Sequence, residues 1–271
     1  RDSSTSRGLG DVYKRQTSNI SGGEGGTWCA QVPACSAVAV YADYQPTLNR
    51  ACELAHILGE ASLRDRLIAY PAIAQNPSLL SCEIAGRFFM DAFLAQLLEE
   101  TEWERREHAA VLWQALRQIG VNLLHLPFRF ELSHRLHEER RHGYLSVNDI
   151  NKLTNTIWED YFADTVRGSD QYVWAAKLHF YLPREPHYDW QYTAGYLIAA
   201  VLRRRLLADG CTACGGSFGD FLSDCATIDC DELIRRHLGA DPASDAFWTD
   251  AATEALNVMR DADRHIQSFI S

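Results

Sequence analysis

Apolar residues recur at spacings of three and four positions, with few interruptions, from Pro46 to the end of this chain. This period matches one face of an α-helix, so it requires the chain to fold mainly as packed helices. The expected helices cover about residues 47–59, 78–98, 102–119, 127–142, 146–164, 170–181, 190–208, 216–224, 230–238 and 244–269. Small and β-branched residues in Thr27–Val32 and Ser36–Tyr41 predict two short strands before them. The sequence therefore predicts a mostly α fold with a short β-sheet near its N-terminus.

The first residues differ in character from the rest of the chain. Arg1–Gln16 is polar and has no apolar period, and its ending resembles translated sequencing-linker sequence. We therefore expect residues 1–21 to be disordered and residues 22–271 to form the folded domain. The chain has 271 residues and 46% hydrophobic content, which is enough to bury a sizeable core.

Charge and composition exclude several classes of partner. The formal net charge is −10, and no concentrated basic stripe offsets it, so nucleic-acid binding is not expected. The longest apolar run, Tyr192–Val201, is too short to span a membrane and is followed by Arg203–Arg205, so no membrane partner is expected. The chain shows no signal peptide, and its eight cysteines are expected to stay reduced. These features favour a cytoplasmic protein.

A candidate metal-binding segment occupies residues 56–60, which read H-I-L-G-E. His56 and Glu60 are four positions apart, so a helix would place both side chains on one face. Glu83 opens the next long helix and can add a third ligand from a second element. One imidazole and two carboxylates, with a position left open, would suit a divalent metal ion. The spacing alone also fits an ordinary surface pair.

Longer motifs give this segment a context. The helix carries T-L at 47–48, L-A-H at 54–56 and G-x-A at 59–61, and L-S-C-E-I-A-G follows at 80–86. Further segments are L-L-H-L-P-F-R-F-E at 123–131, H-E-E-R-R-H-G-Y-L-S at 137–146, W-A-A-K-L-H-F-Y at 174–181, Y-T-A-G-Y-L at 192–197 and H-L-G-A-D at 237–241. In these motifs, from about residue 22 to 269, the chain resembles the oligoendopeptidase F and thimet oligopeptidase family of zinc metallopeptidases. The matched part is that family's C-terminal catalytic half, and its N-terminal part is missing.

The resemblance implies a zincin-like helical metallopeptidase catalytic domain that uses zinc to hydrolyse short peptides. It places His56, Glu60 and Glu83 at the positions of the three metal ligands. In the family the helix reads H-E-x-x-H, but here Ile57 stands at the general-base position and Glu60 replaces the second histidine. An isoleucine cannot accept or pass a proton. We therefore expect a catalytically impaired peptidase with no intact catalytic residue, and its zinc occupancy remains open.

Two alternatives remain for the same helix. Cys52, Glu53 and His56 read C-E-L-A-H, a form of the motif in which a thiolate replaces one histidine and Glu53 is the base, which would allow an active metallohydrolase. A non-catalytic peptide-binding domain would keep the cleft without the chemistry. The resemblance also implies polar or acidic residues where Gly86 and Met90 stand, so the ligands would have fewer outer partners.

A segment rich in histidine and tyrosine, P-H-Y-D-W-Q-Y-T-A-G-Y at 186–196, is the expected substrate side of the site. The resemblance implies that His187, Tyr188, Tyr192 and Tyr196 face the metal and donate hydrogen bonds to a substrate carbonyl oxygen. Tyr188 and Tyr192 are four apart and share a helix face. The alternative is that these rings only pack the helix wall.

A further cysteine set has spacing that would admit a structural zinc ion. It reads C-x2-C-x10-C-x4-C and consists of Cys211, Cys214, Cys225 and Cys230. The second pair has an unusual spacing for a zinc site, so free thiols are the alternative.

Overall fold

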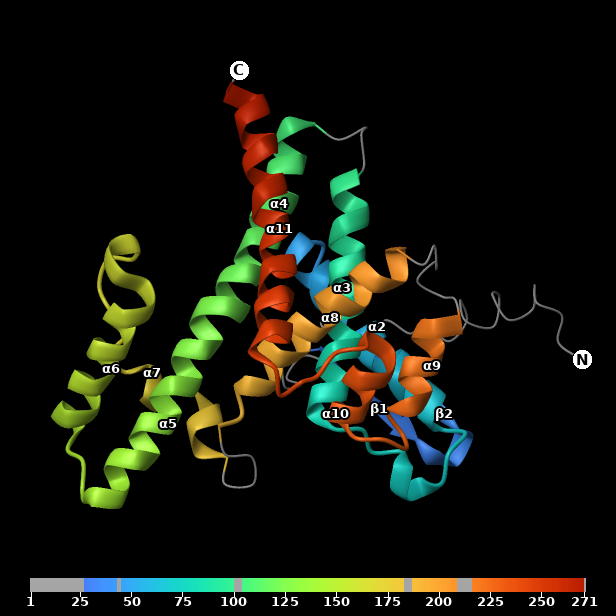
Figure 1. Ribbon diagram of the computed structural model, residues 1–271, viewed down its shortest axis with the longest axis horizontal. Helices are drawn as coiled ribbons and strands as arrows, with labels where there is room; N and C mark the ends of the chain where they lie inside the picture. The colour runs from blue at the N-terminus through green and yellow to red at the C-terminus, as the bar shows by residue number, and fades with distance from the viewer. Residues whose placement is uncertain (1–26, 43–44, 100–103, 183–186, 209–215, 271) are drawn as a thin grey trace, which may run out of the picture.

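The computed structural model describes residues 27–42, 45–99, 104–182, 187–208 and 216–270. Within these ranges the protein is mostly α-helical, with a two-stranded antiparallel sheet near the start (Figure 1). This confirms the predicted fold class. Residues 1–21, predicted to be disordered, and two members of the cysteine set, Cys211 and Cys214, lie outside the described residues. None of the described helices is long and apolar enough to cross a membrane.

The elements follow one another in the predicted order. The two strands are β1 (Thr27–Val32) and β2 (Ala37–Ala42). The longer helices are α2 (Leu48–Leu67), α3 (Leu79–Glu99), α4 (Arg105–Gly120), α5 (Leu126–His142), α6 (Val147–Phe162), α8 (Trp190–Ala208), α9 (Gly216–Asp224) and α11 (Asp245–Ile270). Short helical pieces are η1 (Pro33–Cys35), η2 (Ala72–Ala74), η3 (Val121–His125), η4 (Ala163–Thr165), α7 (Val173–Ala176), η5 (Leu178–Tyr181), α10 (Cys230–Leu233) and η6 (Ile234–Leu238).

The sheet is a hairpin that packs against α2. Its strands pair in antiparallel register, with Thr27 opposite Ala42. The side-chain amide of Gln31 donates to the carbonyl oxygen of Arg64 on α2 at 3.0 Å. The hairpin is therefore tied to the helix that carries His56.

Helix α2 is longer than predicted. It starts after Thr47, whose hydroxyl accepts the backbone N–H of Arg50, and it ends at Leu67 instead of near residue 59. The predicted end was wrong because Gly59 is a residue typical of helix stops. In the structure Gly59 lies inside the helix, where a Cβ atom would stand 2.3 Å from the carbonyl oxygen of Ala85 on α3. The glycine therefore marks a close crossing of two helices.

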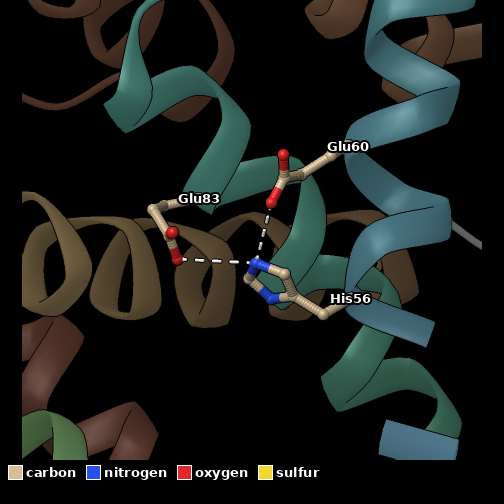
Figure 2. A group of neighbouring side chains, drawn as sticks. All are labelled: His56, Glu60 and Glu83. Carbon is tan, nitrogen blue, oxygen red and sulfur yellow. Dashed lines mark ion pairs between the residues drawn. The ribbon is translucent and has the colours of Figure 1, made fainter. Parts of the chain in front are cut away.

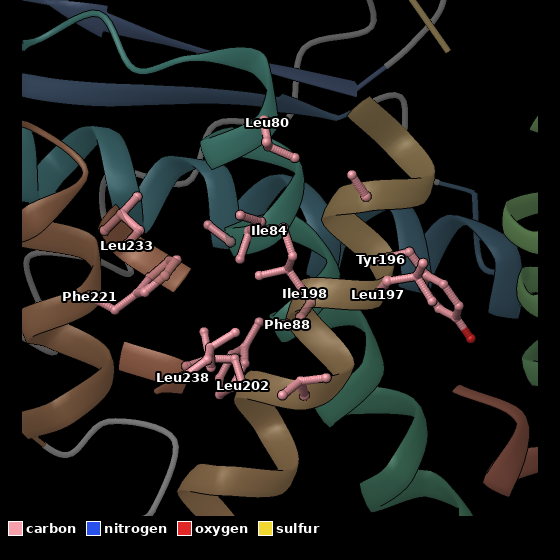
Figure 3. Close-up of a cluster of buried hydrophobic side chains, with 14 of the residues drawn as sticks. Leu80, Ile84, Phe88, Tyr196, Leu197, Ile198, Leu202, Phe221, Leu233 and Leu238 are labelled. Atoms are coloured by element: carbon pink, nitrogen blue, oxygen red, sulfur yellow. The ribbon is translucent and has the colours of Figure 1, made fainter. Parts of the chain in front are cut away.

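The main hydrophobic core lies between α3 and α8 and is completed by α9, α10, η6 and α11 (Figure 3). Its labelled members are Leu80, Ile84 and Phe88 of α3, Tyr196, Leu197, Ile198 and Leu202 of α8, and Phe221, Leu233 and Leu238 of the later helices. Burial of one such side chain contributes about 1.5–3 kcal/mol. This core holds α8 along α3. It thereby fixes the helix that carries Glu83 and the helix that packs against it.

A second, smaller cluster lies beside the main body, where α5, α6 and α7 meet (Figure 1). Its buried residues are Phe128, Leu132, Ile157, Phe162 and Val173. A buried ion pair joins it to the main body, because Arg129 Nη2 on α5 lies 2.7 Å from Asp189 Oδ1 just before α8. The first turn of α8 is thereby anchored to α5.

Two further boundaries differ from the prediction. α4 and α5 run into each other through the π-helical segment η3, and Pro127 falls in the first turn of α5, where its missing N–H is tolerated. The predicted helix 170–181 is instead two short pieces, α7 and η5, interrupted by an extended backbone at Lys177 (φ −104°, ψ 118°). Most of this segment is exposed apart from Val173, so no continuous apolar face holds it as one helix.

Charged side chains also meet between α3 and α8. Arg87 and Asp91 are four apart on α3, and Arg203 on α8 acts on the same carboxyl. Burial raises the pKa of Asp91 to about 6, although Arg87, Arg203 and His56 each lower it. The nearby phenol of Tyr196 has its pKa raised by burial and by Asp91. Folding therefore works against the ionised form of Asp91.

Replacement of Gly59 by alanine should destabilise the protein. The added Cβ would meet backbone rather than a flexible side chain, so α2 and α3 must separate, at about 1–3 kcal/mol. Urea unfolding measures the change. Gly120→Ala is the matched control, because nothing lies within 4 Å of a Cβ at that helical position. It should be neutral or stabilising. Equal loss in both variants would contradict the close-crossing role of Gly59.

Asp91→Asn should raise stability at neutral pH, and the gain should shrink in acid. The folded state holds the Asp91 proton more tightly than the unfolded chain does, so the wild type loses stability as pH rises from about 3.8 to about 6. Asparagine removes that loss, which is on the order of 1–3 kcal/mol above pH 6. Thermal unfolding between pH 4 and 8 measures it. The matched control is Asp160→Asn, because Asp160 is exposed on α6. A gain from Asp91→Asn that is constant with pH would contradict the assignment.

Candidate metal centre

Three side chains predicted to bind a metal converge in the structure. His56 and Glu60 come from adjacent turns of α2, and Glu83 comes from the first turns of α3 (Figure 2). His56 Nε2 lies 3.3 Å from Glu60 Oε1 and 3.6 Å from Glu83 Oε2. One ligand atom from each residue falls within 4.8 Å of the others. Figure 2 shows the imidazole facing both carboxylates.

Glycines make this convergence possible. A Cβ on Gly86 would stand 2.6 Å from His56 Cε1 and Nε2, so the imidazole occupies the space that a side chain at that position would need. A Cβ on Gly195 of α8 would stand 2.7 Å from Glu83 Cβ. Gly86 is thus the residue that lets the His56 ring lie against α3. The glycines allow α2, α3 and α8 to pack closely around the site.

The donor set fits a small divalent ion. When ligand atoms lie about 2.0–2.2 Å from a tetrahedral ion, they are roughly 3.3–3.6 Å from each other. The two distances from His56 Nε2, 3.3 and 3.6 Å, fall in that range. Glu83 Oε2 and His56 Nδ1 are buried and have no hydrogen-bond partner among the described residues. An ion between the three residues would satisfy the carboxylate oxygen, while Nδ1 would still lack the outer partner that ligating histidines usually have.

Electrostatics at Glu83 point the same way. Its side chain is 6% exposed, and burial raises its pKa, with His56 and Arg87 lowering it and Glu60 raising it. Arg87 Nε lies 3.8 Å from Glu83 Oε2, and its Nη1 donates to Gln118 Oε1 at 2.9 Å. A cation close to Glu83 would offset the cost of burying its charge.

The centre opens into a cavity of about 490 Å³ between α2, α3, α4 and α8. Its lining residues are Thr27, Asn49, Arg50, Cys52, Glu53, His56, Ile57, Glu60, Glu83, Arg87, Met90, Arg117, Gln118, Val121 and Tyr192. Ile57 is only 5% exposed and lies next to His56 in the chain. Its side chain has no group that can transfer a proton, so this part of the cavity wall is apolar.

Residues of the alternative motif lie in the same cavity but are otherwise engaged. Cys52 is 1% exposed and belongs to an apolar cluster with Met90. Burial raises the pKa of its thiol to about 11, so it stays protonated at neutral pH. Glu53 accepts hydrogen bonds from Arg50 at 2.5 Å and from Asn49 at 2.7 Å. Neither residue joins the convergent group.

The expected substrate-side residues divide between three places. Tyr192 lines the cavity, and burial, Tyr188 and Glu83 all raise its pKa, which keeps the phenol neutral and able to donate. Tyr188 lies against Tyr192, with ring centroids 5.5 Å apart, and is not among the cavity-lining residues. Tyr196 is 4% exposed in the main core. His187 lies beside His137 of α5 and is also absent from the cavity lining.

The basic and amide side chains of the cavity were not predicted from the sequence. Arg87 is one helical turn after Glu83, so the helix period alone could have placed it beside the ligand. Arg117 and Gln118 come from α4, and no sequence pattern connects them with α2. Arg117 Nη1 donates to Asn49 Oδ1 at 2.6 Å and so binds α4 to the start of α2.

Comparison with known proteins supports the fold. No family model matches the sequence, and no curated protein matches it. A protein from Chlamydophila abortus assigned as a peptidase matches with a TM-score of 0.73 and 17% identity, over 89% of this chain and 40% of that one. Oligoendopeptidase-F from Enterococcus faecium matches with a TM-score of 0.62 and 19% identity, over 81% and 40%. PZ peptidase A, solved with an inhibitor, matches with a TM-score of 0.71 and 15% identity, over 96% and 46%.

This chain spans less than half the length of each of these proteins. The matches cover 81–96% of this chain. The chain therefore has the fold found in oligoendopeptidase-type peptidases, over about two fifths of their length.

Proposed function

We propose that this chain is part of a metallopeptidase of the oligoendopeptidase F and thimet oligopeptidase type. It binds a metal ion and short peptides but hydrolyses them slowly or not at all. One observation carries the proposal. His56, Glu60 and Glu83 bring their ligand atoms within 4.8 Å of one another at a cavity lined also by Ile57 and Tyr192. The order of the motifs along the chain and the fold likeness support the family assignment.

The residues that would hold the ion are His56, Glu60 and Glu83. When bound, a divalent ion supplies Lewis acidity toward a peptide carbonyl. Two carboxylates and one imidazole suit harder ions better than two imidazoles and one carboxylate do, so zinc would compete here with ions such as Mn²⁺. The site would also carry more negative charge than the site of that family. The added charge would make a bound ion a weaker Lewis acid.

Proton transfer is the step that the chain has lost. A water that attacks a peptide bond needs a base beside it, and the departing amine needs an acid. Ile57 can do neither, and Glu53 is held by Arg50 and Asn49. Loss of general base catalysis costs roughly 10²–10⁴ in rate. We therefore infer slow or absent hydrolysis.

Substrate contacts remain in place. Tyr192 presents a neutral phenol at the cavity, where it can donate to a peptide carbonyl oxygen. The charged residues of the cavity wall are of both signs. They are Arg50, Arg87 and Arg117 together with Glu53, Glu60 and Glu83. Short peptides are the partners that suit such a cavity. We propose a cytoplasmic role in binding or slowly trimming them.

Metal binding is the first test. The chelator-treated chain, dialysed against Zn²⁺ or Mn²⁺ and assayed by mass spectrometry, should bind an ion that depends on Glu83. Glu83→Gln keeps the shape but removes the anionic ligand, so affinity should fall at least about tenfold. Glu53→Gln is the matched control, because Glu53 lines the same cavity without joining the convergent group.

The outcomes separate the alternatives. Loss of metal binding in Cys52→Ala but not in Glu60→Gln would favour the Cys52-Glu53-His56 motif, because Cys52 is a ligand in that motif and Glu60 is not. Peptide hydrolysis by the unchanged chain that a chelator abolishes would contradict the loss of turnover. Peptide binding that is unaffected by a chelator would favour a binding domain that needs no metal.

Restoring the two altered positions should recover metal binding and then chemistry. Ile57→Glu with Glu60→His recreates the H-E-x-x-H pattern. We expect tighter zinc binding and a chelator-sensitive gain in cleavage of a quenched fluorescent peptide, of about 10²–10⁴ when general base catalysis returns. The control is Ile57→Gln with Glu60→His, which should bind zinc equally well without the gain. No improvement in zinc binding in either variant would contradict the alignment of this helix.

A further inference from the structure

Three histidines gather near the start of α8, outside the residues that line the cavity. His134 and His137 lie one turn apart on α5, and His187 precedes α8. The ring centroid of His187 lies 4.9 Å from that of His137 and 5.6 Å from that of His134. None of the three lines the cavity of the metal centre. We call these residues the histidine cluster.

Ser133 contacts two of the rings, in each case at the Nδ1 atom. His137 Nδ1 lies 2.7 Å from the backbone carbonyl oxygen of Ser133, so Nδ1 carries the proton and donates it. His187 Nδ1 lies 3.1 Å from the Ser133 hydroxyl oxygen. Both rings therefore have Nε2 available, and a neutral Nε2 with Nδ1 hydrogen-bonded to a fixed oxygen is the arrangement of metal-ligating histidines.

The backbone at His187 supports a specific role for its side chain. Its φ angle is +56°, a left-handed conformation that non-glycine residues adopt infrequently. The conformation is held from its C-terminal side, because His187 O accepts the backbone N–H of Trp190 and Asp189 forms an ion pair with Arg129. A backbone held in this conformation brings the imidazole toward α5, and such positions concentrate at functional sites.

His134 is the histidine of the cluster whose side chain can change rotamer most easily. Its side chain is 46% exposed, and its Nε2 lies 3.4 Å from Glu138 Oε1 in this structure. The cluster is more open than the metal centre, which is the one group of three among the described residues whose ligand atoms already fall within 4.8 Å. Rotation of an exposed side chain such as His134 is fast and costs little. Such a rotation would bring a ring nitrogen of His134 toward the Nε2 atoms of His137 and His187.

We propose that His134, His137 and His187 form a second metal site, selective for borderline transition-metal ions such as Zn²⁺, Ni²⁺ or Cu²⁺. All three donors are imidazoles, which these ions prefer, whereas the carboxylate-rich centre favours harder ions. An ion here would connect α5 to the segment before α8, beside the Arg129–Asp189 ion pair. Its role is to clamp the smaller cluster of helices onto the main body, because an ion that binds only the folded chain stabilises it.

The test uses the full, untagged, chelator-treated chain carrying His56→Ala, so that the first centre cannot contribute. Equilibrium dialysis against Zn²⁺ should find one bound ion. His137→Ala and His187→Asn in this background should each weaken binding by at least about tenfold. Asparagine is chosen because it tolerates the left-handed backbone at residue 187. Ser133→Ala should weaken binding about 10–100-fold, because it removes the hydroxyl partner of His187 Nδ1. The backbone carbonyl oxygen that accepts from His137 Nδ1 is kept.

His142→Ala is the matched control, since His142 is an exposed histidine at the end of the same helix outside the cluster. It should leave Zn²⁺ binding unchanged. Binding of Cu²⁺, followed by its visible absorption, should show nitrogen ligation that is lost in His137→Ala. His137 is exposed on a helix, so this variant keeps the fold whatever happens at residue 187. No bound Zn²⁺ in the His56→Ala chain, or equal binding in His137→Ala and His142→Ala, would overturn the proposal.

Discussion

The close crossing of α2 and α3 is the constraint on which the rest of the site depends. Gly59 leaves room for the Ala85 carbonyl oxygen, and one turn away Gly86 leaves room for the His56 ring. With a Cβ at either position, the helices would have to move apart. The ligands on α2 and Glu83 on α3 would then lose the separations that suit one small ion. The glycines thus determine the geometry of the centre as much as the ligands do.

Charge burial explains why these residues are arranged as they are. Two carboxylates, Glu60 and Glu83, lie beside one imidazole, and burial raises the pKa of Glu83. Arg87 lies between Glu83 and Asp91 along α3 and lowers the pKa of both carboxyls. Even so, a buried oxygen of Glu83 has no hydrogen-bond partner among the described residues. A structural ion pair would leave that oxygen unsatisfied, whereas a cation bound at the centre would not.

The sequence predicted most helices because their apolar faces have the period of 3.6 residues, and it failed where packing outweighs local preference. Gly59 has the properties of a helix stop, but it lies inside α2 because α3 approaches there. Residues 170–181 have helical spacing but little buried surface, so they form two short pieces instead. The convergence of His56, Glu60 and Glu83 was predicted from helix geometry and motif resemblance, and the structure brings them together. Arg117 reaches the cavity through a contact between α2 and α4 that no local pattern contains.

The segment from His187 to Tyr192 connects the two proposed sites. His187 faces α5, Asp189 is paired with Arg129 of α5, and Tyr192 faces the cavity of the metal centre. Because these residues lead into α8 and form its first turn, the placement of the Tyr192 phenol depends on how firmly this segment is held against α5. The Arg129–Asp189 pair already holds it, and a metal ion in the histidine cluster would add a second restraint two residues away. Under the proposed function, loss of the general base at Ile57 and retention of peptide binding through this turn would have separate structural causes.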